Sequence, residues 1–272
     1  MKNRKLMRFA VAACLVAGVQ AAAFAAPKKS RNAAKTAPAK APVTILAAAA
    51  ASLEYSFAGE LIPLFQAKYP YISVEGAYDS SGKLQTQIEN GLEADVFMSA
   101  ATKQMNTLAD ERLIDRESVK PLLENKIVLI KPAGSETGVT GFQDAAKAHI
   151  IALGDPASVP AGQYAKEAFT SLGVWEEVER KASFGTNVTE VLNWVAAGSA
   201  DAGVVYATDA ATTPKVEVIA EAPEGSLAQK VVYPVGIVAS SAHPAEARLF
   251  VDFLASAEGL AVFERYGFSP NK

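Results

Sequence analysis

The chain has 272 residues, with 26 Lys and Arg against 29 Asp and Glu, a net charge of −3, one cysteine and two histidines. The first 42 residues hold nine of the basic residues and no acidic one, so residues 43–272 carry a net charge of about −12. Such an acidic body argues against nucleic-acid binding, and its length is sufficient for a large hydrophobic core.

Residues 1–26 have the pattern of an export signal. Four basic residues precede an apolar stretch from Phe9 to Val19, and Ala23-Phe24-Ala25 is typical of a cleavage signal. The stretch is too short to span a membrane. Val11 to Cys14 resembles a lipoprotein box, but we discount it because few apolar residues precede Cys14. We expect cleavage near Ala25 and export to the periplasm, which leaves a mature chain without a thiol.

Residues 27–42 are rich in Lys, Ala and Pro and contain no large apolar side chain. A segment of this composition cannot bury a core, so we predict a flexible tether. It is basic enough to touch an anionic surface, but a solvated linker is the simpler interpretation.

The first half of the globular part alternates strands and helices. Val43 to Leu46 predicts a strand, and apolar residues at 53, 57, 61, 64 and 65 predict a helix with Ser52 at or near its N-cap. Pro63 is expected to kink or restart this helix. Tyr71 to Tyr78 predicts a second strand, Ser80-Ser81-Gly82 starts a second helix, and a third strand follows at 94–100.

The second half repeats the alternation. Strands are predicted at 126–130, 150–153, 182–184, 202–206 and 231–239, with a loop at 131–140 and helices starting at Ala161-Gly162, at Asn187-Val188 and near His243. Pro234 places the last strand at an edge or a crossing point. Strand and helix in alternation indicate an α/β protein with mostly parallel sheets.

Four of these helix starts share a feature, in that each follows a strand or short loop and carries small or hydroxyl residues. They are Ala51-Ser52, Ser80-Ser81, Ala161-Gly162 and Asn187-Val188. Ligands of open α/β sheets bind beyond the carboxyl ends of strands, where such helix starts point. Each helix N-terminus carries about half a positive charge, so four together match a dianion without any Lys or Arg. The alternative is that Ser52 and Ser81 only cap their own helices.

Several segments resemble the molybdate-binding proteins of bacterial molybdate ABC transporters, over nearly all of residues 43–270. The segments that carry the resemblance are Ala49-Ala50-Ala51-Ser52-Leu53, Ser80-Ser81-Gly82-Lys83-Leu84, residues 94–100, Gly154-Asp155-Pro156 with residues 160–168, Asn187-Val188, residues 203–210, and Arg265-Tyr266-Gly267-Phe268.

The resemblance implies a two-lobed periplasmic-binding-protein fold of the class II type, each lobe a mostly parallel sheet flanked by helices. We place lobe 1 at 43–128 and 232–272, and lobe 2 at 129–231. The resemblance also implies that the oxyanion is held by two serine hydroxyls with their backbone N–H groups, two further backbone N–H groups and a tyrosine hydroxyl. By motif, these groups belong to Ser52, Ser81, Ala161, Val188 and Tyr206.

This family resemblance further implies a binding protein rather than an enzyme, with molybdate or tungstate as ligand and no cofactor. The five residues would contact the oxygens of the anion rather than the metal. The expected partner is the membrane permease of a molybdate ABC transporter, with no nucleic acid, and the expected state is a monomer. Thr189 departs from the family, in which an arginine is common at this position.

Two other interpretations stay open. A sulfate or phosphate receptor of the same architecture would share most of these features. An exported enzyme acting on a small anion is less well supported, because the sequence has no Gly-x-Ser-x-Gly nucleophile elbow and only His149 and His243 as histidines. No Cys/His cluster of metal-ligand spacing is present in the sequence.

Overall fold

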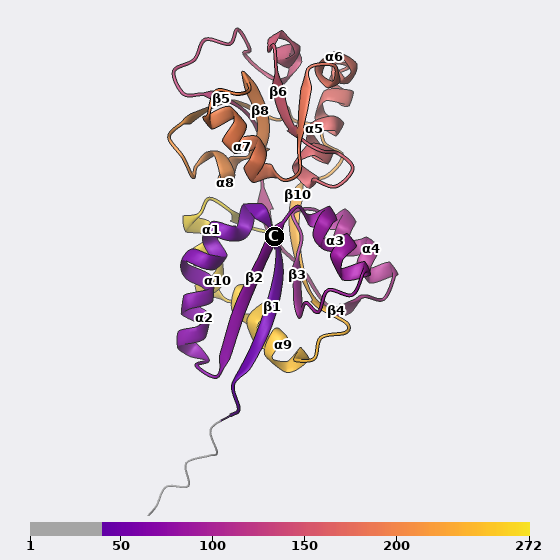
Figure 1. Ribbon diagram of the computed structural model, residues 1–272, viewed down its shortest axis with the longest axis vertical. Helices are drawn as coiled ribbons and strands as arrows, with labels where there is room; N and C mark the ends of the chain where they lie inside the picture. The colour runs from indigo at the N-terminus through magenta and orange to yellow at the C-terminus, as the bar shows by residue number, and fades with distance from the viewer. Residues whose placement is uncertain (1–39) are drawn as a thin grey trace, which may run out of the picture. The chain divides into compact units, whose positions relative to one another are not determined.

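The computed structural model describes residues 40–272, and these form an α/β protein with a six-stranded and a five-stranded sheet (Figure 1). The predicted export signal and residues 27–39 of the predicted tether lie outside the described residues. Among residues 40–272, no helix combines the length and the apolar character that a membrane crossing requires.

The first sheet has the strand order β11-β4-β10-β3-β1-β2. Its strands are β1 (Val43–Ala50), β2 (Ile72–Asp79), β3 (Val96–Met98), β4 (Ile114–Asn125), β10 (Val231–Val238) and β11 (Ser269–Pro270). Strands β2, β1 and β3 are parallel, whereas β10 runs antiparallel to β3 and β4. We call this sheet with its helices the first lobe.

The second sheet has the order β7-β6-β8-β5-β9 and, with its helices, forms the second lobe. Its strands are β5 (Ile127–Pro132), β6 (Ile151–Gly154), β7 (Ala182–Gly185), β8 (Ala202–Tyr206) and β9 (Val216–Glu221). Again three strands are parallel, β7, β6 and β8, while β5 is antiparallel to β8 and β9. The chain passes between the sheets at β4–β5 and at β9–β10.

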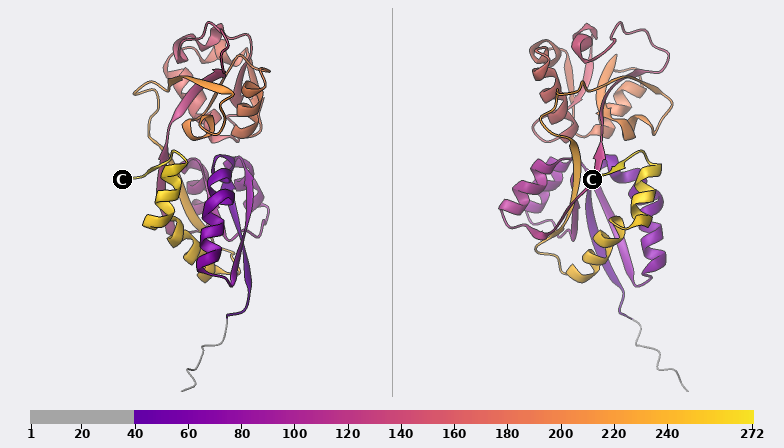
Figure 2. Two further views of the ribbon diagram at one scale, coloured as in Figure 1. Left: turned by 90° about the vertical axis from the view of Figure 1, so that its left-hand side faces the viewer. Right: turned by 180° about the vertical axis from the view of Figure 1, so that it is seen from behind.

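Helices cover both sheets. Those of the first lobe are α1 (Glu54–Ser56), α2 (Ile62–Lys68), α3 (Ser81–Glu89), α4 (Thr102–Asp110), α9 (Pro244–Leu254) and α10 (Ala257–Arg265). Those of the second lobe are α5 (Pro160–Ser171), α6 (Trp175–Glu179), α7 (Val188–Ala196) and α8 (Ala207–Ala210), with a 3₁₀ segment at Phe142–Lys147. The C-terminal helices lie beside the first helices of the chain (Figure 2), where Phe57 packs edge-on against Phe250.

The predicted fold class is confirmed, but the sheets are mixed rather than mostly parallel. The parallel part of each sheet comes from consecutive strand–helix units, as the sequence pattern indicates. The antiparallel part comes from the strands that carry the chain between the lobes, β4 with β10 and β5 with β9. The strand by which the chain enters each lobe, β5 or β10, runs against the parallel strands, whereas the strand by which it leaves, β4 or β9, runs with them.

Strand β1 is longer than predicted because its alanines continue it to Ala50. Ala47 and Ala49 are fully buried in the main core, and Ala48 is fully buried in a second cluster with Leu84 and Phe97. Alternation along the strand explains this division, since successive side chains point to opposite faces. Both faces of β1 are therefore covered, and methyl groups let the covering elements approach closely.

The two prolines that punctuate predicted elements are accommodated within them. A π-helical turn spans Phe57–Leu61, immediately before α2, in which Pro63 occupies the first turn. Proline has no N–H to donate, so the wider turn lets the helix continue past it. Pro234 lies in β10 between β4 and β3, at a shift of register, so it occupies an irregularity inside the sheet rather than an edge.

Candidate functional site

Ser52, Ser81, Ala161, Val188 and Tyr206 all line one small cavity, with an empty volume of about 200 Å³. The other lining residues are Ala50, Ala51, Ser80, Ala100, Val159 and Pro160. The first lobe supplies the serines and the second lobe supplies Ala161, Val188 and Tyr206. The structure thus brings together the five residues chosen from the sequence, while their role in binding stays a prediction.

Ser52 lies in a 3₁₀ turn, Ala51–Leu53, that follows β1 directly. It lies two residues after the N-cap, Ala50, as predicted, but the alternative that it caps the helix is not met, since no side chain makes a capping hydrogen bond there. The Ser52 hydroxyl lies instead 3.0 Å from the Tyr233 hydroxyl on β10. A partner 181 residues away along the chain replaces the local one.

Ser81 is the first residue of α3, and its side chain also serves a purpose other than capping. Its Oγ accepts a hydrogen bond of 2.9 Å from the backbone N–H of Ala100, just beyond β3. A hydroxyl that accepts from the backbone keeps its own proton for another acceptor. Ser80, the N-cap residue, also lines the cavity, and its buried hydroxyl has no partner among the described residues.

Ala161 and Val188 lie in the first turns of α5 and α7. Backbone N–H groups in a first turn have no partner within the helix, so they are available to a ligand. The start of α5 is pressed against the end of β6, because a Cβ on Gly162 would stand 1.9 Å from the Gly154 carbonyl oxygen. Only glycine at 162 allows this approach, which fixes where the donors of α5 point.

Tyr206 ends β8 and is the largest side chain at the cavity. It is buried, and burial raises the pKa of its hydroxyl well above the usual value, so the group stays protonated and able to donate. Its ring packs edge-on against Tyr233 at 5.5 Å between centroids. The hydroxyl points across to the first lobe, 3.4 Å from the Ala100 carbonyl oxygen.

Among residues 40–272, no charged side chain lines this cavity. Its polar groups are N–H and O–H donors at helix starts, where the helix dipole is positive, so the arrangement suits an anion that only accepts hydrogen bonds. Apart from Tyr206 it holds no side chain that titrates, and residues 40–272 contain no cluster of His, Cys, Asp or Glu able to hold a metal ion.

Direct contacts join the two lobes around the cavity. The backbone N–H of Gly82 in α3 donates to the Ser158 carbonyl at 2.9 Å, and a Cβ on Gly82 would stand 2.4 Å from that oxygen. The Gln104 amide donates to the Gln163 side chain at 3.2 Å. The lobes are therefore closed on each other at the site.

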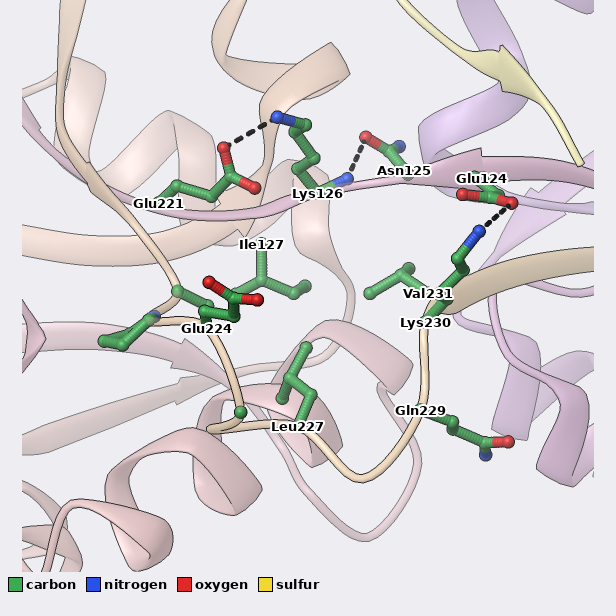
Figure 3. A pocket seen from close by; sticks show the side chains of 13 residues that line it. Glu124, Asn125, Lys126, Ile127, Glu221, Glu224, Leu227, Gln229, Lys230 and Val231 are labelled. Atoms are coloured by element: carbon green, nitrogen blue, oxygen red, sulfur yellow. Dashed lines mark hydrogen bonds and ion pairs between the residues drawn. The ribbon is translucent and has the colours of Figure 1, made fainter.

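A larger pocket lies where the chain crosses between the sheets (Figure 3), and it differs in character. Four of its five charged side chains are paired, Lys126 with Glu221 at 2.8 Å and Lys230 with Glu124 at 2.9 Å, and the fifth is an acidic residue, Glu224. Because these pairs are mutually satisfied and exposed, we do not take this pocket as the ligand site.

Three polar residues near the site were missed from the sequence. Ser80 precedes the predicted residue Ser81, so the Ser80-Ser81 pair was the sequence signal that could have indicated it. Tyr233 and Asn125 carry no local signal, because each reaches the site only through the packing of β10 and β4 beside the first turn.

Asp209, in α8, lies beneath Tyr206 and has no cationic partner among the hydrogen bonds and ion pairs of residues 40–272. Burial raises the pKa of its carboxyl to about 7, although the backbone N–H of Tyr206 donates to it at 3.2 Å and lowers the pKa. The folded protein therefore holds this proton more tightly than the unfolded chain, so the free energy of unfolding decreases as pH rises from about 4 to about 7.

We expect Asp209→Asn to remove this decrease. The amide oxygen still accepts the Tyr206 N–H, but no charge is buried at neutral pH. The melting temperature of the variant, measured between pH 5 and pH 8 without ligand, should fall less with pH than that of the unchanged protein. Parallel curves for the two proteins would show that Asp209 does not govern the pH dependence.

Comparison with known proteins agrees with this geometry. Residues 45–269 match the family described as bacterial extracellular solute-binding protein. YvgL of Bacillus subtilis, named only provisionally as an ABC transporter substrate-binding lipoprotein, is 40% identical over 227 residues, covering 84% of this chain and 86% of that one. The molybdate-binding protein ModA of Haemophilus influenzae is 38% identical over 205 residues, covering 74% and 80%.

Solved structures share the fold. The periplasmic molybdate-binding protein of Azotobacter vinelandii has a TM-score of 0.72 at 21% identity, covering 84% of this chain and 100% of that one. The sulfate-binding protein SubI from Mycobacterium tuberculosis has a TM-score of 0.71 at 17% identity, covering 84% and 87%. The fold alone therefore does not select the anion, whereas the family is clear: this chain belongs to the bacterial extracellular solute-binding proteins, which bind solutes and are not enzymes.

Proposed function

We propose that this protein captures molybdate in the periplasm and delivers it to the membrane permease of a molybdate ABC transporter. The observation that carries the proposal is the cavity itself, in which donors from both lobes converge and no charged side chain intervenes. The ModA relative, which is named for molybdate binding, supports the choice of anion. Tungstate is expected to bind as well, and the protein is expected to act as a monomer.

The donors in question are the hydroxyls of Ser52, Ser81 and Tyr206 and the backbone N–H groups of Ala161 and Val188. We add Ser80, because its buried hydroxyl has no other partner among residues 40–272. A fully ionised tetrahedral oxyanion accepts from every one of these groups. Hydrogen phosphate would turn a proton toward donors, since no carboxylate lines the cavity to accept it.

Calorimetric titration with molybdate, tungstate, sulfate and phosphate tests the proposal. Molybdate and tungstate should bind with similar affinity, and sulfate and phosphate more weakly. Tightest binding of sulfate or phosphate would favour the receptor for that anion, and a turnover of phosphoesters would favour an exported enzyme.

Single substitutions at the donors test the site. Ser52→Ala and Tyr206→Phe should each weaken molybdate binding by roughly 10- to 150-fold, since a hydrogen bond to a charged group contributes about 1.5–3 kcal/mol. Ser56→Ala is the matched control, because Ser56 is buried four residues away and bonds the Leu53 carbonyl outside the cavity. Equal affinities in Ser52→Ala, Tyr206→Phe and the control would remove both residues from the site.

An anion bridging the two lobes stabilises the closed form, so we expect molybdate to reduce the radius of gyration in solution scattering. The lobes are taken as residues 43–128 with 232–272, and residues 129–231. Gly82→Ala should weaken both the compaction and the binding, because its methyl group would meet the Ser158 carbonyl of the other lobe.

The control is the melting temperature of Gly82→Ala without ligand. It should not fall, because alanine favours the helical conformation of α3 more than glycine does. Scattering curves that are the same with and without molybdate would argue against closure.

A further inference from the structure

A chain of hydrogen bonds leads from the crossing between the sheets to the cavity. Asn125, the last residue of β4, contacts Tyr233 on β10, and Tyr233 contacts Ser52 at the cavity wall. Neither Asn125 nor Tyr233 lines the cavity. The direction in which the protons point along this chain decides whether Ser52 offers the cavity a proton or a lone pair.

The amide of Asn125 can be oriented in only one way. Its Oδ1 accepts a hydrogen bond of 2.8 Å from the backbone N–H of Lys126 (Figure 3), and a backbone N–H only donates. The amide nitrogen must then be Nδ2, which donates to the Thr208 hydroxyl at 2.9 Å and to the Tyr233 hydroxyl at 3.3 Å. Both of its protons are used.

Tyr233 therefore accepts from Asn125 and must send its own proton elsewhere. Its contact with the Ser52 oxygen, at 3.0 Å, is one in which either atom can be the donor, so the Tyr233 hydroxyl can donate there. The Tyr233 side chain is fully buried, and burial raises the pKa of its hydroxyl well above the usual value, so the proton is retained. The Tyr233 ring packs between the rings of Tyr206 and Phe268, with centroid distances of 5.5 and 5.4 Å.

The Ser52 oxygen accepts a hydrogen bond from the Tyr233 hydroxyl. The Ser52 hydroxyl can therefore donate its own hydrogen bond into the cavity. Ser81 reaches the same condition by a shorter route, since its oxygen accepts the backbone N–H of Ala100 at 2.9 Å. The oxygens of Ser52 and Ser81 thus each accept a hydrogen bond from a group outside the cavity. Both hydroxyls can therefore donate to a bound anion.

We propose that Asn125 and Tyr233 are positioning residues that fix the Ser52 hydroxyl as a donor and so select a fully deprotonated oxyanion. This inference rests on the proposed function and deepens it. The direction of these hydrogen bonds is set at the crossing between the lobes, because the backbone N–H of Lys126 can only donate.

Asn125→Asp reverses the relay. A carboxylate at this position only accepts hydrogen bonds, so the Tyr233 hydroxyl donates to it. The Tyr233 oxygen then accepts a hydrogen bond from the Ser52 hydroxyl, and a lone pair of the Ser52 oxygen faces the anion. Asn125 borders the pocket of Figure 3, so the carboxylate remains close to solvent. In calorimetry, the dissociation constant for molybdate should rise on the order of 30-fold or more.

A double-mutant cycle separates the relay from the added negative charge. Tyr233→Phe keeps the ring packing and cuts the relay, and alone it should weaken binding by up to about tenfold, since Ser52 can still rotate to donate. In that background Asn125→Asp should cost no more than about threefold further. An equal cost in both backgrounds would mean that the charge acts through space and would overturn the proposal, as would unchanged affinity in Asn125→Asp.

Neutron diffraction on the unaltered, deuterated protein gives an answer that does not depend on the folding of a variant. The deuterium of Tyr233 should point at the Ser52 oxygen, with or without molybdate, and a deuterium of Ser52 that points at Tyr233 would refute the relay. Failure of the proposed function would show differently, as absence of molybdate binding by the unaltered protein in the first titration.

Discussion

A site without cations can hold a doubly charged anion only if every group on its wall turns a proton inward. Helix starts meet this condition without assistance, because the first N–H groups have no partner in the helix. Hydroxyls do not, since they donate or accept with equal ease. For two of the wall hydroxyls the structure resolves the ambiguity with a donor on the side away from the cavity, the Ala100 N–H for Ser81 and the Tyr233 hydroxyl for Ser52. Much of the packing around β10 can be understood as support for that arrangement.

How far the sequence predicts this protein depends on the range of the interaction. The parallel strand–helix units were predictable because each is specified within about 30 residues by apolar periodicity and turn residues. Strand β4 was missed, since its 12 residues include Asp, Arg, Glu, Lys and Pro without a regular alternation, and its place in the sheet is fixed by pairing with β10 more than a hundred residues later. Distant pairings also make both sheets mixed, of β10 with β3 and β4 in the first and of β5 with β8 and β9 in the second.

The candidate site shows the same division. The residues that line the cavity were found because small and hydroxyl residues at helix starts are a local signal, sharpened by the family resemblance. Local reasoning left open that Ser52 only caps its helix, the usual role of a serine there, and gave no sign of its contact with Tyr233. Local sequence reasoning could not identify Tyr233 and Asn125. A tyrosine in an apolar strand and an asparagine at a strand end usually have roles in packing or in turns.

The uncharged cavity wall also has a consequence for the speed of capture. Residues 43–272 carry a net charge of about −12, and none of the lysines and arginines that the structure describes lines the cavity to draw an anion inward. A negatively charged ligand thus approaches against the long-range field, and its attraction begins only within reach of the helix starts. Dissolved salt screens that repulsion, so we expect encounter to quicken as ionic strength rises, the reverse of electrostatic steering.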